Sequence, residues 1–119
     1  MKTSELGSIA IVDDDDSARD ALKFLLTVLG RRPKCFASAR EFLEEATDAF
    51  SRLILDQNMP GMTGLELAEH LRSKQNDIPI MLISGGLTQD VIDKAAQLRV
   101  NLVLQKPADL RVLESFIGG

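Results

Sequence analysis

The regular alternation of short apolar runs with longer amphipathic segments is the feature that most constrains the fold of this chain. Five apolar runs have the length and composition of β-strands and occupy residues 8–12, 34–37, 52–56, 79–84 and 102–105. The segments that follow them carry apolar residues at helical spacing and occupy residues 17–29, 38–46, 63–73, 88–98 and 109–117. This (βα)5 order, with strands that are apolar on both faces, predicts an α/β fold with a doubly wound, five-stranded parallel sheet.

The predicted helices have suitable residues at their ends. Ser38 and Thr63 are each followed three residues later by a glutamate, which is the pattern of a capping box. Thr88 and Asp109 are suited to cap the last two helices. Gly30 follows the first helix, where a left-handed residue commonly ends a helix. Local signals therefore support the boundaries that the periodicity predicts.

The length of 119 residues fits one domain, so residues 1–119 are expected to fold as a single unit. No linker, repeat or low-complexity tract interrupts the pattern. The last predicted helix ends in Gly118 and Gly119. This ending leaves open that the chain is a segment of a longer protein with a truncated final helix.

Charge and composition exclude several classes of function. The net charge of −4 argues against nucleic-acid binding, which needs clustered lysine and arginine. The single cysteine, Cys35, excludes an internal disulfide and fits a reducing compartment. The N-terminus is polar, with no signal peptide, and no run approaches the roughly 20 apolar residues that span a bilayer. A cytoplasmic protein without membrane or nucleic-acid partners is expected.

Charged residues stand at the ends of three of the predicted strands. Asp13 and Asp14 follow the first strand, Asp56 ends the third, and Lys106 follows the fifth. Chemistry in open parallel sheets collects at the carboxyl ends of the strands, so these side chains are expected to meet at one rim. Carboxylates crowded there would repel one another unless a cation lay among them. The rim is therefore predicted to be a Mg²⁺ site with a lysine beside it.

Taken without the other strand ends, the acidic run has a simpler interpretation. Acidic residues favour helix N-termini, and Asp15 and Asp16 are expected to serve only as the start of the first helix. The same interpretation would suit Asp13 and Asp14, were it not for Asp56 at a matching strand end. The coincidence of strand ends favours a site.

Four motifs in register resemble the receiver domains of two-component response regulators. They are Val-Asp-Asp at residues 12–14, Asp-x-x-Met-Pro-x-x-x-Gly at residues 56–64, Ser-Gly at residues 84–85 and Lys-Pro at residues 106–107. The resemblance covers essentially the whole chain. It implies a flavodoxin-like fold and a phosphoacceptor that serves a histidine kinase.

The resemblance assigns roles to the acidic residues. It implies that Asp56 is the phosphoacceptor, a carboxylate nucleophile that forms an acyl phosphate. Asp14, Asp56 and the backbone carbonyl of Asn58 would bind Mg²⁺ directly, and Asp13 would act through a coordinated water. Mg²⁺ suits this set because it takes few protein carboxylates and keeps waters and phosphate oxygens. Beyond its own phosphorylation and dephosphorylation, the chain is not expected to be an enzyme.

The same resemblance covers the other two motifs. Lys106 would pair with the phosphoryl group, and Ser84 would donate its hydroxyl to that group. The Lys106–Pro107 peptide bond is expected to be cis. The chain departs from the family at Val103, where an aromatic side chain often acts as a rotameric switch. This departure puts in question how phosphorylation reaches the face formed by the last strand and the two helices beside it.

The resemblance also implies a docking surface for the kinase, made by the first helix and the loop after the fifth strand. Ala18 and Ala21 are expected on the outer side of that helix, where small side chains allow another helix to pack closely. Pro107 and Ala108 would complete the surface.

Three other functions remain open. A haloacid-dehalogenase-type phosphatase also uses an aspartate nucleophile and Mg²⁺, and residues 13–15 resemble its Asp-x-Asp motif; that family also needs a later acidic pair, which residues 84–86 lack. A receiver fold kept only as a binding module would normally lack the acceptor, the acid pair or the lysine. A flavodoxin-like cofactor binder is disfavoured because the first turn is acidic where a phosphate cradle needs glycines.

Overall fold

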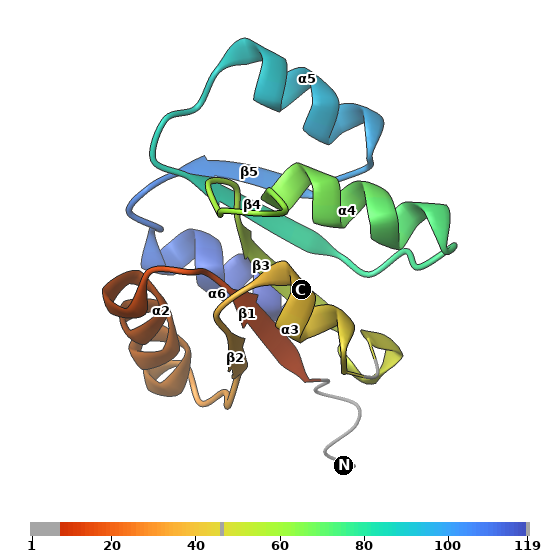
Figure 1. Cartoon of the computed structure of the whole chain (residues 1–119). Coiled ribbons are helices and arrows are strands. Elements are labelled where there is room, and N and C mark those ends of the chain that lie inside the picture. The colour runs from red at the N-terminus through yellow and green to blue at the C-terminus, as the bar shows by residue number, and fades with distance from the viewer. Residues whose placement is uncertain (1–7, 46, 119) are drawn as a thin grey trace.

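The computed structural model describes residues 8–45 and 47–118 and contains one five-stranded parallel sheet (Figure 1). The strand order is β2-β1-β3-β4-β5, with β1 (Ile9–Val12), β2 (Lys34–Phe36), β3 (Arg52–Asp56), β4 (Ile80–Ser84) and β5 (Leu102–Gln105). The helices are α2 (Asp16–Val28), α3 (Ala39–Leu43), α4 (Gly64–Ser73), α5 (Gln89–Gln97) and α6 (Leu110–Gly118), with a short 3₁₀-helix η1 (Thr47–Ala49). The predicted fold class is confirmed, and each strand end lies within one residue of its prediction. Ala46, predicted in the second helix, lies outside the described residues.

The helices cover both faces of the sheet, with α3, α4 and α5 on one face and α2 and α6 on the other (Figure 1). Alternate residues of a strand point to opposite faces. In β1, Ala10 and Val12 pack with the first group of helices, and Ile9 and Ile11 with the second. Because both faces are buried, the strands read as continuous apolar runs.

The helix starts form largely as predicted. Asp15 caps α2 by accepting a hydrogen bond from the Ala18 amide at 3.1 Å. Thr63 and Glu66 make both hydrogen bonds of a capping box at the start of α4. The predicted box at Ser38 is only half formed, because the glutamate three residues later accepts from the amide before Ser38 instead of from that of Ser38 itself. The sequence did not indicate η1.

Arg72 fastens the end of α4 to the end of α5. Its guanidinium donates at 2.8 Å to the carbonyl of Leu98, the C-cap residue of α5. It also donates at 2.9 Å to the carbonyls of Asn76 and Ile78, which follow α4. A fourth hydrogen bond from the same side chain goes to the carbonyl of Arg99 at 3.0 Å. Together these bonds connect the carboxyl end of α4 to that of α5.

β5 is an edge strand, and within the described part of the chain it pairs only with β4. Its apolar residues Leu102, Val103 and Leu104 are half-buried, whereas all five residues of β4 are buried. Side chains in β5 are therefore less enclosed than those in the sheet centre.

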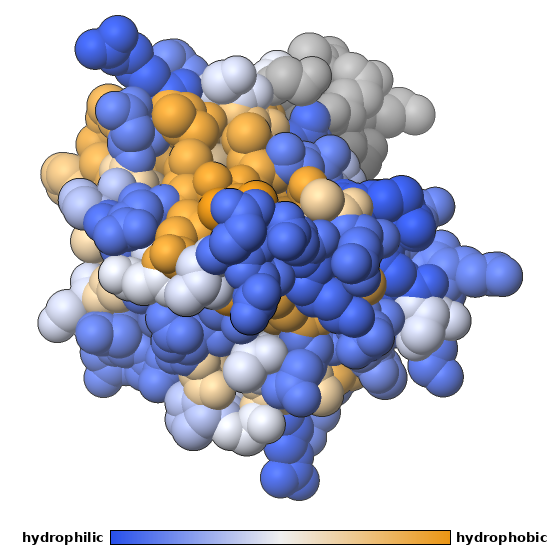
Figure 2. All heavy atoms as spheres, turned by 90° about the horizontal axis from the view of Figure 1, so that it is seen from above, coloured by the Kyte–Doolittle hydropathy of each residue, from blue (hydrophilic) through white to orange (hydrophobic). Residues whose placement is uncertain are grey.

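The surface is mostly hydrophilic when the molecule is seen from above, with α5 nearest the viewer, and apolar side chains gather in one region of it (Figure 2). No helix of the described residues is long and apolar enough to span a membrane.

Candidate functional site

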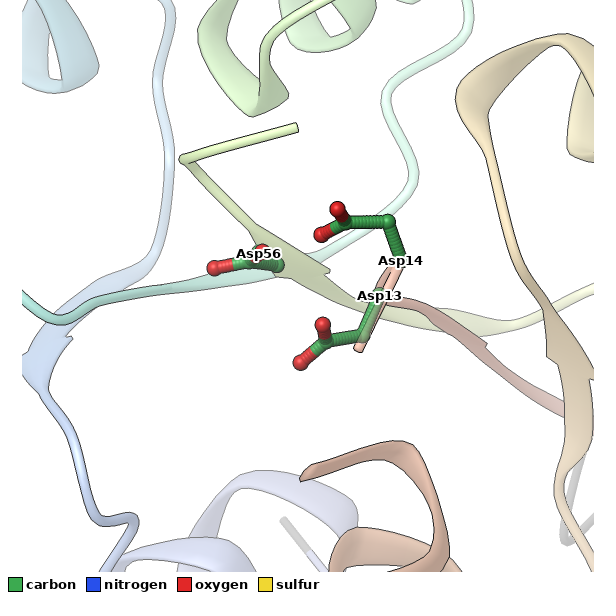
Figure 3. A group of neighbouring side chains, drawn as sticks. All are labelled: Asp13, Asp14 and Asp56. Carbon is green, nitrogen blue, oxygen red and sulfur yellow. The ribbon is translucent and has the colours of Figure 1, made fainter. Parts of the chain in front are cut away.

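Three carboxylates meet at the carboxyl ends of β1 and β3, which are neighbours in the sheet. One oxygen from each of Asp13, Asp14 and Asp56 lies within 4.8 Å of the others. The three side chains point the same way, beyond the ends of their strands (Figure 3). The predicted juxtaposition of these residues at one rim is therefore present.

The site is enclosed on one side and open on the other. Asp13 and Asp56 are buried, with 1% and 4% of their surface exposed, whereas Asp14 is exposed. The Lys106 ammonium lies 3.3 Å from Asp13 Oδ2 and 3.2 Å from Asp56 Oδ1. One lysine thus faces two buried carboxylates, so negative charge already exceeds positive charge. The exposed Asp14 carboxylate adds to this excess at the rim.

The electrostatics of the site disfavour the charged form of Asp56. Burial raises the pKa of its carboxyl, the charge of Asp13 raises it further, and Lys106 opposes both only in part. Burial by itself lowers the pKa of the Lys106 ammonium, but the contacts with Asp56 and Asp13 outweigh that effect and the net direction is upward. Among the described buried side-chain atoms, Asp56 Oδ1 has no hydrogen-bond partner. An added cation beside Asp56 would relieve this imbalance.

Asp13 is held at every polar atom. Its Oδ1 accepts from the amide of Asp15 at 3.0 Å and its Oδ2 from Lys106 at 3.3 Å. Its amide donates to the carbonyl of Phe36 at 3.1 Å, and its own carbonyl accepts from Arg19 Nη1 at 2.7 Å. The bond from Arg19 was not predictable from the sequence, because a hydrogen bond from a helix side chain back to a strand carbonyl has no local pattern.

Ser84 ends β4 and is fully buried beside the loop after β3, residues 57–63. Its hydroxyl oxygen accepts from the amide of Gly86 at 3.2 Å and from the side-chain amide of exposed Asn58 at 3.3 Å. A hydroxyl has two acceptor sites and one donor hydrogen. With both acceptor sites engaged, the hydrogen is available to an incoming group.

Gly64 lets the loop after β3 fold tightly against the sheet. A Cβ at this position would lie 2.5 Å from the carbonyl oxygen of Asp56 and 2.7 Å from Leu82 Cδ1. The loop is closed by the Gly64 amide, which donates to the carbonyl of Gln57 at 3.1 Å, and by Gln57 Oε1, which accepts from the amide of Leu65 at 2.8 Å. The glycine of the predicted motif therefore has a steric reason.

The last motif is arranged as expected. The Lys106–Pro107 peptide bond is cis. Val103 is half-buried, pairs with Leu82 across the sheet and packs on the side of α4 and α5. It has no ring to move toward Ser84.

A family model described as "Response regulator receiver domain" matches residues 9–117. The chain belongs to this family. It is a response regulator receiver domain of two-component signalling, homologous to those of FixJ and CheY. Membership sets aside the phosphatase and the flavodoxin-like cofactor binder considered from the sequence.

Several curated relatives carry names from signalling. The chemotaxis protein CheY of Pseudomonas aeruginosa is 34% identical, with 92% of this chain and 91% of that protein covered. The transcriptional regulatory protein FixJ of Bradyrhizobium diazoefficiens is 32% identical, with 85% and 50% covered. The response regulator TmoT of Ectopseudomonas mendocina is 45% identical, with 65% and 36% covered. The chain thus spans between about a third and a half of the length of TmoT and FixJ.

Solved structures agree with this placement. The crystal structure titled FixJ-N has a TM-score of 0.84 at 31% identity and covers 93% of this chain and 90% of its own. The Vibrio cholerae chemotaxis protein CheY4 has a TM-score of 0.83 at 26% identity and covers 93% and 95%.

The residues of the rim fit the Mg²⁺ that receiver domains bind at an acidic pocket. Three carboxylates supply the hard oxygen donors that Mg²⁺ prefers. One of these oxygens, Asp56 Oδ1, is buried, and its contact with the Lys106 ammonium at 3.2 Å lacks hydrogen-bond geometry. Both observations are those expected where a cation completes the site.

A second surface of this receiver domain lies beside the rim. One apolar hollow between α2 and the loop after β5 is lined by Asp13, Ala18, Ala21, Leu22, Leu25, Ile83, Lys106, Pro107 and Ala108. It contains all four residues predicted to meet a kinase. Ala21 is exposed as expected, and Ala18 is half-buried.

The outer side of α2 carries two large exposed apolar side chains that the sequence-based prediction of the docking surface did not include. Phe24 and Val28 have 67% and 59% of their surface exposed. The helical period could have revealed them, because at 100° per residue both positions fall opposite buried Leu22 and Leu26.

Proposed function

We propose that Asp56 is the phosphoacceptor of this receiver domain and takes a phosphoryl group from a histidine kinase. The observation that carries the proposal is the position of its carboxylate. It is buried at the end of β3, within 3.2 Å of the Lys106 ammonium and beside two further carboxylates. Its oxygen nearest the lysine, Oδ1, accepts no hydrogen bond of good geometry from the described residues, whereas both carboxylate oxygens of Asp13 accept one.

In the proposed reaction, a carboxylate oxygen of Asp56 attacks the phosphorus of the donor. The bond from phosphorus to the donor's imidazole nitrogen breaks, and the imidazole leaves with that electron pair, so an acyl phosphate forms. Lys106 balances charge on the phosphoryl oxygens, and Ser84 donates its free hydrogen to one of them. The steps need the domain's own residues, the donor and a bound Mg²⁺. The chain catalyses no reaction other than its own phosphorylation and dephosphorylation.

The proposed Mg²⁺ ligands are the Asp14 and Asp56 carboxylates and the backbone carbonyl of Asn58, with Asp13 acting through a water. When bound, Mg²⁺ supplies positive charge that stabilises the phosphoryl oxygens during transfer. The firm anchoring of Asp13 by hydrogen bonds supports its indirect role, since its two carboxylate oxygens are already engaged.

Receiver domains interact with histidine kinases. We propose that the kinase docks on Ala18, Ala21, Pro107 and Ala108, because this hollow adjoins Asp13 and Lys106 and is apolar. Phe24 and Val28, three and seven residues after Ala21, add exposed apolar surface to α2 beside this hollow. The net charge of −4 supports a domain without a nucleic-acid partner of its own. We further propose that residues 1–119 form one receiver domain and that it acts in the cytoplasm without a membrane partner.

The acceptor can be tested by labelling with acetyl phosphate and Mg²⁺. Mass spectrometry should find one added phosphoryl group on the wild-type domain and none on Asp56→Asn. Asp48→Asn, which changes an exposed carboxylate of η1, serves as the matched control and should label normally. Normal labelling of Asp56→Asn would refute the assignment.

A further inference from the structure

Arg19 lies in the first turns of α2 and reaches back to the end of β1. Its Nη1 donates to the carbonyl oxygen of Asp13 at 2.7 Å, and its Nη2 contacts the carboxylate of Asp16. Only 17% of the side chain is exposed. The α2 backbone also fixes this residue, because the Arg19 amide donates to the carbonyl of Asp15 at 2.9 Å. The guanidinium is therefore held by Asp13 and Asp16, and the backbone of Arg19 is fixed within the helix.

The carbonyl that Arg19 holds belongs to the peptide bond between Asp13 and Asp14. A peptide unit is planar, so fixing its oxygen also fixes the direction in which the chain enters Asp14. The Asp14 carboxylate is exposed, and within the described part of the chain no donor holds it by a hydrogen bond. Its place among the three carboxylates (Figure 3) consequently depends on the backbone beneath it.

We propose that Arg19 is a positioning residue for the metal site, because it sets the Asp13–Asp14 peptide so that the Asp14 carboxylate faces Asp56. This inference rests on the proposed Mg²⁺ ligands. It concerns a residue that touches neither the metal nor the phosphoryl group and acts through a backbone carbonyl. Residues that orient metal ligands in this way typically change metal affinity by about 10–100-fold when replaced.

The guanidinium also has an electrostatic effect of the opposite sign. A positive charge near three carboxylates disfavours a second cation, so loss of Arg19 would tighten Mg²⁺ binding if charge dominated. The contact with Asp16 offsets much of that charge. We therefore expect the loss of orientation to outweigh the loss of repulsion, and the sign of the change distinguishes the two effects.

The test is isothermal titration of Mg²⁺ into the wild-type domain and Arg19→Met, with no phosphodonor present. The dissociation constant should rise by about tenfold in the variant. Labelling by acetyl phosphate at saturating Mg²⁺ should stay within about twofold of the wild-type rate, since the acceptor and lysine are untouched. Arg40→Met is the matched control: it removes an exposed arginine paired with Glu44 on α3 and should bind Mg²⁺ normally.

Thermal unfolding in chelator checks that each variant is folded. Arg19→Lys keeps the positive charge but replaces the planar fork by a single ammonium that cannot serve both Asp13 and Asp16. Arg19→Lys should also bind Mg²⁺ more weakly than the wild type, and because its charge is unchanged, a change of charge cannot explain that result. If Arg19→Met does not fold, Arg19→Lys takes its place in the test. Mg²⁺ binding by Arg19→Met equal to or tighter than wild type overturns the positioning role and leaves the proposed function standing. Absence of Mg²⁺ binding by the wild type overturns the metal site itself.

Discussion

The side-chain amide of Asn58 donates a hydrogen bond to the hydroxyl of Ser84 across 3.3 Å, which ties the loop after β3 to the end of β4. The same hydroxyl accepts from the amide of Gly86 at 3.2 Å. One donor from the loop after β3 and one from the loop after β4 therefore bind the same oxygen atom. Loss of either hydrogen bond should increase the mobility of both loops.

Replacing Asn58 by alanine should loosen the loop after β4. One hydrogen bond contributes about 0.5–1.5 kcal/mol, so amide exchange at residues 85 and 86 should become several times faster. Hydrogen–deuterium exchange measures this directly. Asn76→Ala removes a comparable local bond, the one to the Ile78 amide at 3.0 Å, and should leave these amides unchanged. Unaltered exchange in Asn58→Ala would show that the bond does not restrain the loop.

Asp56→Asn should stabilise the metal-free domain at neutral pH. Because burial and Asp13 raise the pKa of Asp56, the folded state holds its proton more tightly than the unfolded chain. The stability that this group contributes is present at low pH and is lost as pH rises through the raised pKa. The variant cannot ionise, so its melting temperature should exceed the wild-type value by a few degrees at pH 7.

The difference between the two proteins should shrink as the pH falls and vanish near pH 3, below the ordinary pKa of about 3.9, where the carboxyl is protonated in both states. Melting curves between pH 3 and pH 8 in chelator provide the measurement. A variant less stable than wild type at pH 7 would mean that the contact with Lys106 outweighs the burial of the charge.

Gly64→Ala should disturb the acceptor. The added Cβ would meet the Asp56 carbonyl at 2.5 Å, so the backbone that carries the acceptor must shift. Overpacking of this kind costs about 1–3 kcal/mol, and labelling of Asp56 should slow. Urea unfolding and labelling rates test the two effects. Gly118→Ala, where the new Cβ meets no atom within 4 Å, is the control, and equal behaviour of the two variants would contradict the steric explanation.

Phosphorylation should change the structure mainly near Asp56. Val103 has no ring to follow Ser84, so amide protection should change in residues 57–63 and 84–86 and little in α5 and α6. Exchange with and without beryllofluoride as a phosphoryl mimic provides the measurement. Val103→Phe should extend the changes toward α5. Changes spread over residues 109–117 of the wild-type domain would show that the expectation is wrong.

Ala21→Arg should block transfer from the kinase while leaving the fold and acetyl phosphate labelling intact. A long charged side chain on the docking surface would keep a partner helix away, and an interface cost of about 1.4 kcal/mol reduces binding by about tenfold. Ala18→Arg should act in the same direction. Ala96→Arg, on the exposed side of α5, is the matched control. Equal loss of labelling and transfer in Ala21→Arg would identify that alanine as structural.

The strand ends were the most predictable part of the site. In a parallel sheet, chain direction alone brings Asp13, Asp56 and Lys106 to one rim, so the acidic cluster followed from the order of the apolar runs. Cap residues such as Thr63 were equally accessible, because their partners lie three residues away. The exposure of Phe24 could also have been predicted, because the helical period places it opposite buried Leu22 and Leu26.

Contacts between distant elements were not accessible from the sequence. The bond from Arg19 to the Asp13 carbonyl depends on where α2 packs against β1, and the bond from Asn58 to Ser84 on how two loops meet. The close approach of Gly64 to the Asp56 carbonyl likewise needs the packed sheet. Each depends on tertiary geometry, for which a single sequence carries no periodic signal.

The hydrogen bonds from Arg72 anchor α5 at its carboxyl end. Its carboxyl end is fastened to α4 through the Leu98 carbonyl, whereas its amino end follows the two glycines after Ser84. A helix of nine residues is about 13 Å long, so a small tilt about the fastened end moves the other end most. Any displacement of this helix, including the small change expected on phosphorylation, should therefore be largest in its first turn, next to the glycines.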